Sequence, residues 1–277
     1  MNKIQKVLNK STVYFFLIFF SVIFIGPFLW LFSTSIKSPS ENIFSYPPKL
    51  IPEHINLNNF VDVWNAVPLG NYFVNSIIIA IISVILNLVF SSLAAYPLAR
   101  LDFKAKNFIF YLILSTMMIP FQVIMIPVFI ICMKLNITNS YIGVILPTCV
   151  SAFGIFLMRQ AFLEIPKELE ESALIDGCSI LDIWWRIMLP LVKPALATLA
   201  IFSFVGSWSD FLWPLIILKD PLKYTLPVGI AYLAGTFSAN WRLIAAGSLI
   251  SIIPIVIIFL FLQKFFIGGI TEGAVKG

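Results

Sequence analysis

The chain has 277 residues, of which 60% are hydrophobic and only 11% are charged, and its mean hydropathy is +0.99. Soluble domains carry about 25% charged residues, so this composition argues against a water-soluble fold and predicts an apolar surface that faces lipid. The formal net charge of +5 comes from basic residues scattered between apolar runs. Because they form no stripe with interleaved aromatic residues, no nucleic-acid partner is expected.

Six charge-poor stretches predict transmembrane helices. A helix crosses a hydrocarbon core of about 30 Å with about 20 apolar residues, whereas a barrel strand would alternate apolar and polar residues. The stretches do not alternate in this way. The predicted spans are residues 13–33, 72–99, 108–133, 141–158, 195–218 and 243–262. We therefore expect an all-α membrane protein, with six transmembrane helices in a single domain of residues 1–277.

The distribution of lysine and arginine predicts the orientation of the chain in the cell membrane, because cytoplasmic connections carry an excess of these residues. With the N-terminus inside, the cytoplasmic segments hold twelve of the 18 lysine and arginine residues, and the outer segments hold six. Both termini are therefore expected in the cytoplasm. The long connection of residues 34–71 then lies outside, and residues 164–194, between the fourth and fifth spans, lie in the cytoplasm.

The cytoplasmic segment of residues 164–194 differs from the rest of the chain, since it holds six of the 13 acidic residues. Its pattern predicts two short helices. Pro166 suits the first turn of the first helix, and Gly177 suits a left-handed residue at its C-terminal end. Ser179, with Asp182 three residues later, matches a capping box at the start of the second helix. The apolar face expected for the second helix comprises Ile183, Trp184, Ile187 and Leu191.

The first of these helices is expected to need a partner, because an isolated helix of about ten residues is marginal in water. Leu169, Ala173 and Asp176 are expected on one side of it, at three- and four-residue spacing. The alternative is a helix that lies on the lipid surface. Helices of that kind are usually basic, whereas this one is acidic, which favours docking against another protein.

The cytoplasmic segment resembles the EAA---DG---------I-LP loop of the permeases of binding-protein-dependent ABC importers, through the run Glu171-Ser172-Ala173-Leu174-Ile175-Asp176-Gly177 and its continuation Ile187-Met188-Leu189-Pro190. The resemblance implies that the loop forms a coupling helix, which sits in a cleft of the cytoplasmic ATPase and transmits its closure to the transmembrane helices. It implies ATPase-coupling roles for Glu171, Ser172, Ala173, Asp176 and Gly177. Ser172 and Cys178 stand where the family usually has alanine, and both are small enough for close helix packing.

Four further stretches, residues 95–100, 207–214, 224–227 and 271–277, resemble carbohydrate-type permeases. In particular, the chain is similar to the smaller partner of the maltose-type permease pair. This resemblance implies a subunit that works, within membrane lipid, with a second and different permease, two cytoplasmic ATPase subunits and an extracellular solute-binding protein. An oligosaccharide, a monosaccharide or a polyol phosphate would each be consistent as the solute.

The chain carries no motif for nucleotide binding or catalysis. It contains no G-x-x-x-x-G-K-[ST] sequence, so ATP is expected on partner subunits and no cofactor is expected here. The three cysteines lie in separate segments, so no metal site is expected. An intramembrane enzyme is a rival interpretation. However, the single histidine, His54, lies in the outer connection, and there is neither an HExxH motif nor an evident pair of nucleophile and base.

Polar or aromatic residues within the predicted spans are candidates for the solute pathway or its gate: Asp210, Gln122, Asn87 and Trp208. Asp210 is the only acidic residue in a span, and such residues are functional candidates, although it could instead partner a neighbouring helix. Hydrogen bonding between helices is the alternative for Asn87 and Gln122, and interface anchoring is the alternative for Trp208. A secondary transporter or channel is the main rival class, and it would normally need more ionisable residues within its spans.

Overall fold

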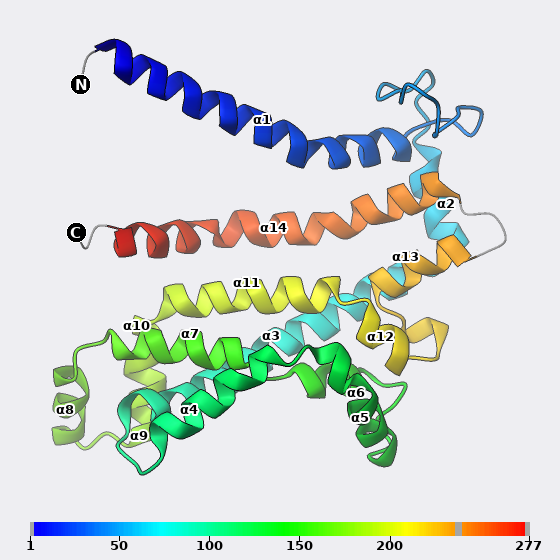
Figure 1. The fold of residues 1–277 in the computed structure, drawn as a ribbon. Helices are drawn as coiled ribbons and strands as arrows, with labels where there is room; N and C mark the ends of the chain where they lie inside the picture. Colours follow the sequence, from blue (N-terminus) through cyan, green and yellow to red (C-terminus); the bar gives the residue numbers. More distant parts are fainter. Residues whose placement is uncertain (1–2, 236–239, 275–277) are drawn as a thin grey trace. The chain divides into compact units, whose positions relative to one another are not determined.

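The computed structural model describes the backbone of residues 3–235 and 240–274, and the side chains of residues 10–235, 240–261 and 263. Helices dominate these residues (Figure 1), which contain no strand beyond an isolated antiparallel bridge between Lys37 and Ile55. The prediction of an all-α fold is therefore confirmed for the described part of the chain.

The elements in chain order are α1 (Lys3–Ser35), α2 (Asn58–Ala66), α3 (Leu69–Arg100), α4 (Lys106–Ser115), η1 (Thr116–Met118), α5 (Phe121–Lys134), α6 (Tyr141–Ile145), η2 (Leu146–Thr148), α7 (Ala152–Leu163), α8 (Glu168–Ile175), α9 (Ile180–Asp182), η3 (Ile183–Met188), α10 (Leu189–Leu191), α11 (Lys193–Ser209), α12 (Leu212–Ile217), η4 (Pro221–Lys223), α13 (Leu226–Gly235) and α14 (Trp241–Ala274). Of these, η3 is a π-helix, and the other η elements are 3-10 helices.

Three helices are each long and apolar enough to cross a membrane: α1 over Lys10–Ser35, α3, and α14 over Trp241–Phe261. Three pairs of helices are long and apolar enough only together, and each pair is bent at a break: residues 106–118 with 121–134 by 101°, residues 141–148 with 152–163 by 48°, and residues 180–191 with 193–209 by 83°. The described residues thus hold three to six candidate spans, and six requires that each bent pair is one span.

The predicted span of residues 108–133 is interrupted between α4 and α5. The backbone of Ile119 is extended, with φ −96° and ψ 111°. This follows from Pro120, because the ring of a proline disfavours the helical conformation of the residue before it. Helices α4 and α5 therefore meet at a sharp bend instead of forming one rod.

The span predicted for residues 195–218 is also interrupted. Helix α11 ends at Ser209, and α12 begins at Leu212. Between them the backbone of Asp210 is extended, with φ −67° and ψ 120°. Its Oδ1 accepts a hydrogen bond from the backbone N–H of Trp213 at 3.4 Å, so Asp210 satisfies one of the unpaired donors at the start of α12.

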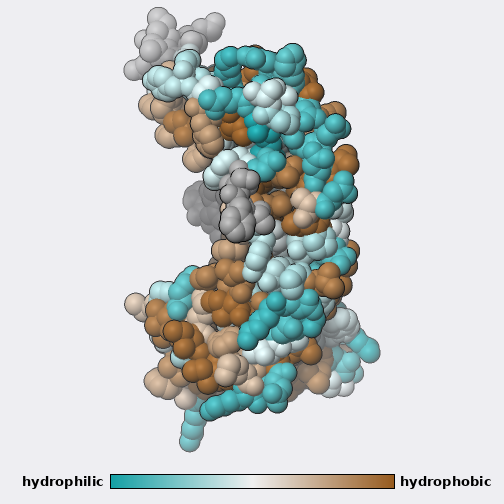
Figure 2. All heavy atoms as spheres, turned by 90° about the vertical axis from the view of Figure 1, so that its right-hand side faces the viewer, coloured by the Kyte–Doolittle hydropathy of each residue, from teal (hydrophilic) through white to brown (hydrophobic). Residues whose placement is uncertain are grey.

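The chain divides into two compact units, residues 1–69 with 229–253 and residues 70–228 with 254–277. In the first unit, apolar side chains of α1 are exposed along most of the helix from Val13 to Phe32. Figure 2 shows apolar side chains, in brown, lying openly on the surface. Such exposure is costly in water and favourable in lipid, which agrees with the membrane class that the composition predicted.

The connection between α1 and α3, residues 36–68, is ordered by hydrogen bonds, and it contains α2, which the sequence did not predict. The Glu41 carboxylate accepts bonds from the backbone N–H groups of Ser38, Glu53 and His54 at 3.0–3.3 Å. Burial raises the pKa of Glu41, but these three donors and the nearby Lys37 ammonium outweigh it and hold the pKa below its usual value. The carboxylate therefore stays ionised and organises the part of this connection that precedes α2, residues 36–57, which is called the Glu41 loop.

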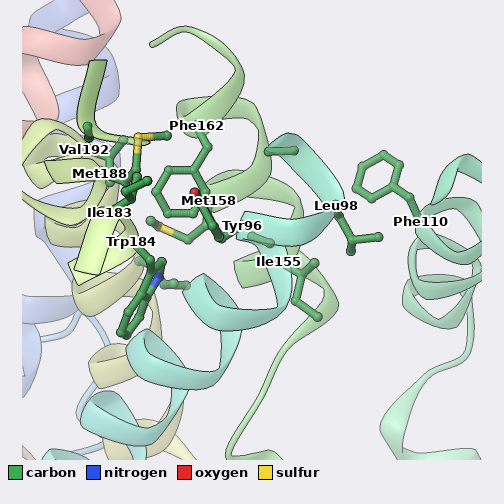
Figure 3. Packing of buried hydrophobic residues seen from close by; sticks show 14 residues of the cluster. Tyr96, Leu98, Phe110, Ile155, Met158, Phe162, Ile183, Trp184, Met188 and Val192 are labelled. Atoms are coloured by element: carbon green, nitrogen blue, oxygen red, sulfur yellow. The ribbon is translucent and has the colours of Figure 1, made fainter. Parts of the chain in front are cut away.

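In the second unit the apolar core lies between the last turns of α3, the helix α7 and residues 173–199. Figure 3 shows the side chains of Tyr96, Met158, Phe162 and Met188 pointing toward one another. Tyr96 and Phe162 meet edge to face at 5.8 Å between ring centroids. Helices α7 and α11 pack side by side (Figure 1). The segment that connects them, residues 164–192, therefore starts and ends at the same end of this pair.

The prediction of an apolar face for the second helix of residues 164–194 was partly wrong. Ile183 and Trp184 are buried as expected, but Leu191 is exposed, and Met188 and Val192 are buried instead. The reason is the π-helical turn η3, which places one more residue in a turn than an α-helix does. The next buried residue on this face, Met188, therefore lies five positions after Ile183. Val192 then follows Met188 at the α-helical spacing of four.

The connections of the second unit gather at two opposite ends. At one end Arg100 Nη2 donates to the carbonyl oxygen of Pro166 at 3.2 Å. At the other end the Asn75 amide donates to the carbonyl oxygens of Leu222 and Tyr224 at 2.9 and 3.0 Å. The connections predicted to be cytoplasmic thus meet each other at the Arg100 end. Which end faces the cytoplasm remains a prediction, and the chain ends, residues 1–2 and 275–277, lie outside the described residues.

Candidate coupling loop and intramembrane cavity

Helix α8 ends in a tight glycine-dependent cap. Gly177 has φ +83°, in the left-handed region that side chains with a Cβ rarely adopt. The N–H groups of Gly177 and Cys178 donate to the carbonyl oxygens of Leu174 and Ala173 at 3.1 and 3.0 Å. These two bonds form a Schellman motif, which satisfies carbonyl groups that the helix itself leaves unpaired. The prediction of a glycine cap is therefore confirmed.

The next turn begins with the predicted capping box. Ser179 Oγ accepts a hydrogen bond from the backbone N–H of Asp182 at 3.2 Å, and the Ser179 hydroxyl donates to the Asp182 carboxylate at 2.5 Å. Two caps in succession make the chain turn sharply between α8 and α9. Helix α8 is consequently presented as a separate short helix at the end of the second unit (Figure 1).

A buried ion pair fixes α8 to the C-terminal end of α3. Arg100 Nε donates to Glu170 Oε2 at 2.9 Å, and the two side chains are 3% and 14% exposed. This pair was not predicted, because its members lie 70 positions apart in the sequence. The signals that could have found it are a basic residue at the end of a predicted span and an acidic residue in the loop expected to lie at the same end.

The residues predicted to couple to an ATPase lie mostly on the surface. Glu171, Ser172, Asp176 and Gly177 are exposed, and Ala173 is buried. Of the three residues expected on one side of the helix, Ala173 is buried, whereas Leu169 and Asp176 are exposed. The buried face of α8 is the one that carries Ala173, because Arg100 binds Glu170 on that side of the helix.

A cavity of about 240 Å³ with both polar and apolar lining residues lies within the second unit. Two of the predicted pathway residues, Asn87 and Asp210, line it together, from α3 and from the break after α11. The aromatic ring of Phe202 forms part of the wall. The polar residues of the lining are Ser83, Asn87, Thr148, Ser203, Ser207 and Asp210.

Hydrogen bonds hold the cavity wall and leave some groups available inside it. Asn87 Nδ2 donates to Ser203 Oγ at 2.8 Å, which ties α3 to α11, and Asn87 Oδ1 accepts from the Ser91 hydroxyl at 2.6 Å. Asn87 therefore does form the bond between helices that was its alternative role. Ser83 Oγ is buried and, among the described residues, has no hydrogen-bond partner. A cavity with a carboxylate, an amide and hydroxyl groups suits a neutral ligand rich in hydroxyl groups.

The other two predicted pathway residues do not line this cavity. Gln122 is exposed in the first turn of α5. Trp208 is 1% exposed, and its ring stacks on Phe204 and meets Phe73 edge to face. The surroundings of Trp208 are thus those of a packed core residue.

The apolar surface and the three to six candidate spans make this an all-helical, membrane-embedded protein. The chain belongs to the family of inner membrane components of binding-protein-dependent transport systems, whose family model matches residues 87–271. That family was the one indicated by the loop of residues 164–194, so the resemblance is confirmed.

Two relatives are similar over nearly the full length. The arabinooligosaccharides transport system permease protein AraQ of Halalkalibacterium halodurans is 42% identical over 262 residues, which cover 94% of each chain. The melibiose/raffinose/stachyose import permease protein MelC of Bacillus subtilis is 38% identical over 255 residues, which cover 91% of each chain. These relatives are transport permeases rather than enzymes.

A solved structure has the same fold. One chain of a bacterial ABC transporter involved in the import of the acidic polysaccharide alginate superposes with a TM-score of 0.81 and 25% identity. The match covers 96% of this chain and 99% of that one.

Proposed function

We propose that this chain is a permease subunit of an ATP-driven importer of sugars or oligosaccharides, and that it translocates solute delivered by an extracellular binding protein. Two relatives support the solute class, since one transports arabinooligosaccharides and another imports melibiose, raffinose and stachyose. Membership of a family of binding-protein-dependent systems supports the binding-protein partner.

The proposed assembly also contains a second, different permease and two cytoplasmic ATPase subunits, which bind the ATP. Coupling would pass through residues 164–194, with Glu171, Ser172, Ala173, Asp176 and Gly177 at the ATPase contact. The observation that supports this most directly is the presentation of α8, a short acidic helix that is fixed at one face and exposed over the rest. Docking would supply the stability that so short a helix lacks alone. In this arrangement both termini lie in the cytoplasm.

Uptake by a reconstituted assembly tests this function. Proteoliposomes would contain this chain, its partner permease and the ATPase subunits, with the binding protein outside and ATP inside. We expect import of arabino-oligosaccharides or raffinose that stops when ATP, the ATPase or the binding protein is omitted. Histidine, an amino acid, serves as the control solute and should not enter. Uptake driven by an ion gradient through this chain alone would instead favour a secondary transporter and would contradict the proposal.

We further propose that Asp210 and Asn87 contact the solute in the intramembrane cavity. Sugar hydroxyl groups need hydrogen-bond partners inside a membrane, and the Asp210 carboxylate is a strong acceptor on the wall. Gln122 and Trp208 remain predictions for the pathway outside this cavity.

Replacing Asp210 by asparagine separates the solute contact from the helix cap. Asparagine caps helices as well as aspartate does, so Asp210→Asn should leave α12 and the assembly intact. We expect the rate of solute import at a fixed ATP concentration to fall about tenfold, the effect of losing a hydrogen bond to a charged group. The matched control is Asp220→Asn, which makes the same change at the cap of η4, where Asp220 Oδ1 accepts from the Leu222 N–H at 3.0 Å. Equal import rates in both variants and the wild type would contradict the contact.

A further inference from the structure

The Arg100–Glu170 pair is unlike the other ion pairs of the described residues. In each of the other three, at least one side chain is more than half exposed, as in the Lys106–Asp102 pair, where Asp102 is 99% exposed. Water and salt screen such surface pairs, and they contribute little. A pair as buried as Arg100–Glu170 is screened far less, and removing one member leaves a buried charge without its partner.

The pair is also a polar attachment of α8 to the end of α3. Ala173 is the only buried residue of α8, and its methyl group buries little apolar area. Arg100 holds the helix at two points, since its Nε bonds Glu170 in the first turn and its Nη2 bonds the carbonyl oxygen of Pro166 just before the helix. The side chain at the end of α3 therefore fixes both the position and the direction of α8.

Helix α3 joins this attachment to the cavity. It runs without a break from Leu69 to Arg100, and it carries Asn87 and Ser83 in the cavity wall. Thirteen residues at 1.5 Å each place Asn87 about 20 Å from Arg100 along the helix. A second arginine holds the same end of α3, because Arg159 Nε donates to the carbonyl oxygen of Leu98 at 3.0 Å. A displacement of α8 must therefore move the end of α3 or break the ion pair.

We propose that Arg100 and Glu170 are positioning residues that fasten the coupling helix to α3, so that displacement of α8 is carried along α3 to the cavity wall at Asn87. This inference rests on the proposed function, since it assumes that an ATPase displaces α8. The pair thus determines how much solute is moved for each ATP hydrolysed, rather than whether the subunits assemble.

The ratio of solute imported to ATP hydrolysed tests this role in the complete reconstituted assembly. The variants are Arg100→Gln, Glu170→Gln, the two combined, and the apolar double variant Arg100→Met with Glu170→Leu. Two controls remove an exposed charge from the connection that follows α3, Asp102→Asn and Lys104→Gln. Copurification of the ATPase subunits measures assembly for every variant.

We expect the ratio to fall about tenfold in each single variant, which is within the usual range of coupling between sites, while ATP hydrolysis continues. The combined glutamine variant should be no worse than the more damaged single variant, because both changes break one link. Both controls should keep the wild-type ratio. If a single variant does not fold, the apolar double variant still tests the inference, because replacing both members of a buried pair by apolar residues usually preserves stability. Its ratio of solute imported to ATP hydrolysed should also fall, since it lacks the ion pair.

A wild-type ratio in the single variants or in the apolar double variant would overturn the inference. So would losses in the two single variants that multiply in the combined variant, since the residues would then act independently. A wild-type assembly that imports no solute with ATP would contradict the proposed function and this inference together. Normal import by the wild type, with unchanged variants, would contradict this inference alone.

Discussion

At the scale of single residues, the cap of α8 depends on the backbone conformation of Gly177. A Cβ atom added there would meet no atom within 4 Å, so a substitution is opposed by backbone strain and not by a clash. The left-handed conformation costs a residue with a Cβ about 1–2 kcal/mol, and a β-branched residue tolerates it least.

Replacing Gly177 by valine should therefore uncouple the loop of residues 164–194. We expect Gly177→Val to distort the end of α8 and to lower ATP-driven import at least about tenfold, since about 1.4 kcal/mol corresponds to a factor of ten. Gly177→Asn is the matched control, because asparagine adopts the left-handed conformation more readily, and it should retain most of the import. The measurement is import by proteoliposomes with equal amounts of assembled complex. Equal activity of the valine variant and the wild type would show that the cap is dispensable.

Residue-level prediction succeeded where a signal is local in the sequence. Gly177 and the Ser179–Asp182 box act within a few positions, so the sequence alone was sufficient to place them. Arg100 and Glu170 form an equally defined contact, but only the fold brings their distant positions together. Asn87 and Asp210 were found as polar residues in apolar spans, while their common cavity depends on how α3 packs against α11.

At the scale of elements, hydrophobic stretches predicted where helices lie but not where they break. Pro120 interrupts the helix at the residue before it, because a proline disfavours the helical conformation there. The extended backbone at Asp210 and the π-helical turn η3 were not predicted, because each interrupts an apolar stretch whose composition does not change there. Helices α2 and α13 were missed because they lie in connections and are shorter than a span.

At the scale of the whole molecule, the positive charge of the connections predicts that the Arg100 end faces the cytoplasm and the Glu41 loop faces outward. Tyr46 and Asp102 are suitable probes, since they are 98% and 99% exposed. In a variant without the three native cysteines, a membrane-impermeant maleimide should label Tyr46→Cys in intact cells. It should label Asp102→Cys only after the membrane is permeabilised. The reverse pattern would contradict the orientation and, with it, the cytoplasmic position of α8.

The way in which the Glu41 loop is ordered determines which surroundings it tolerates. The loop contains no cysteine, so no disulfide holds its shape. It depends instead on an ionised carboxylate that accepts three backbone N–H groups. Because the pKa of Glu41 is lowered in the folded chain, this contribution to stability is present above the ordinary glutamate pKa and is lost only as the pH falls through the lowered value. The loop is thus built to hold its shape in mildly acidic media without a disulfide.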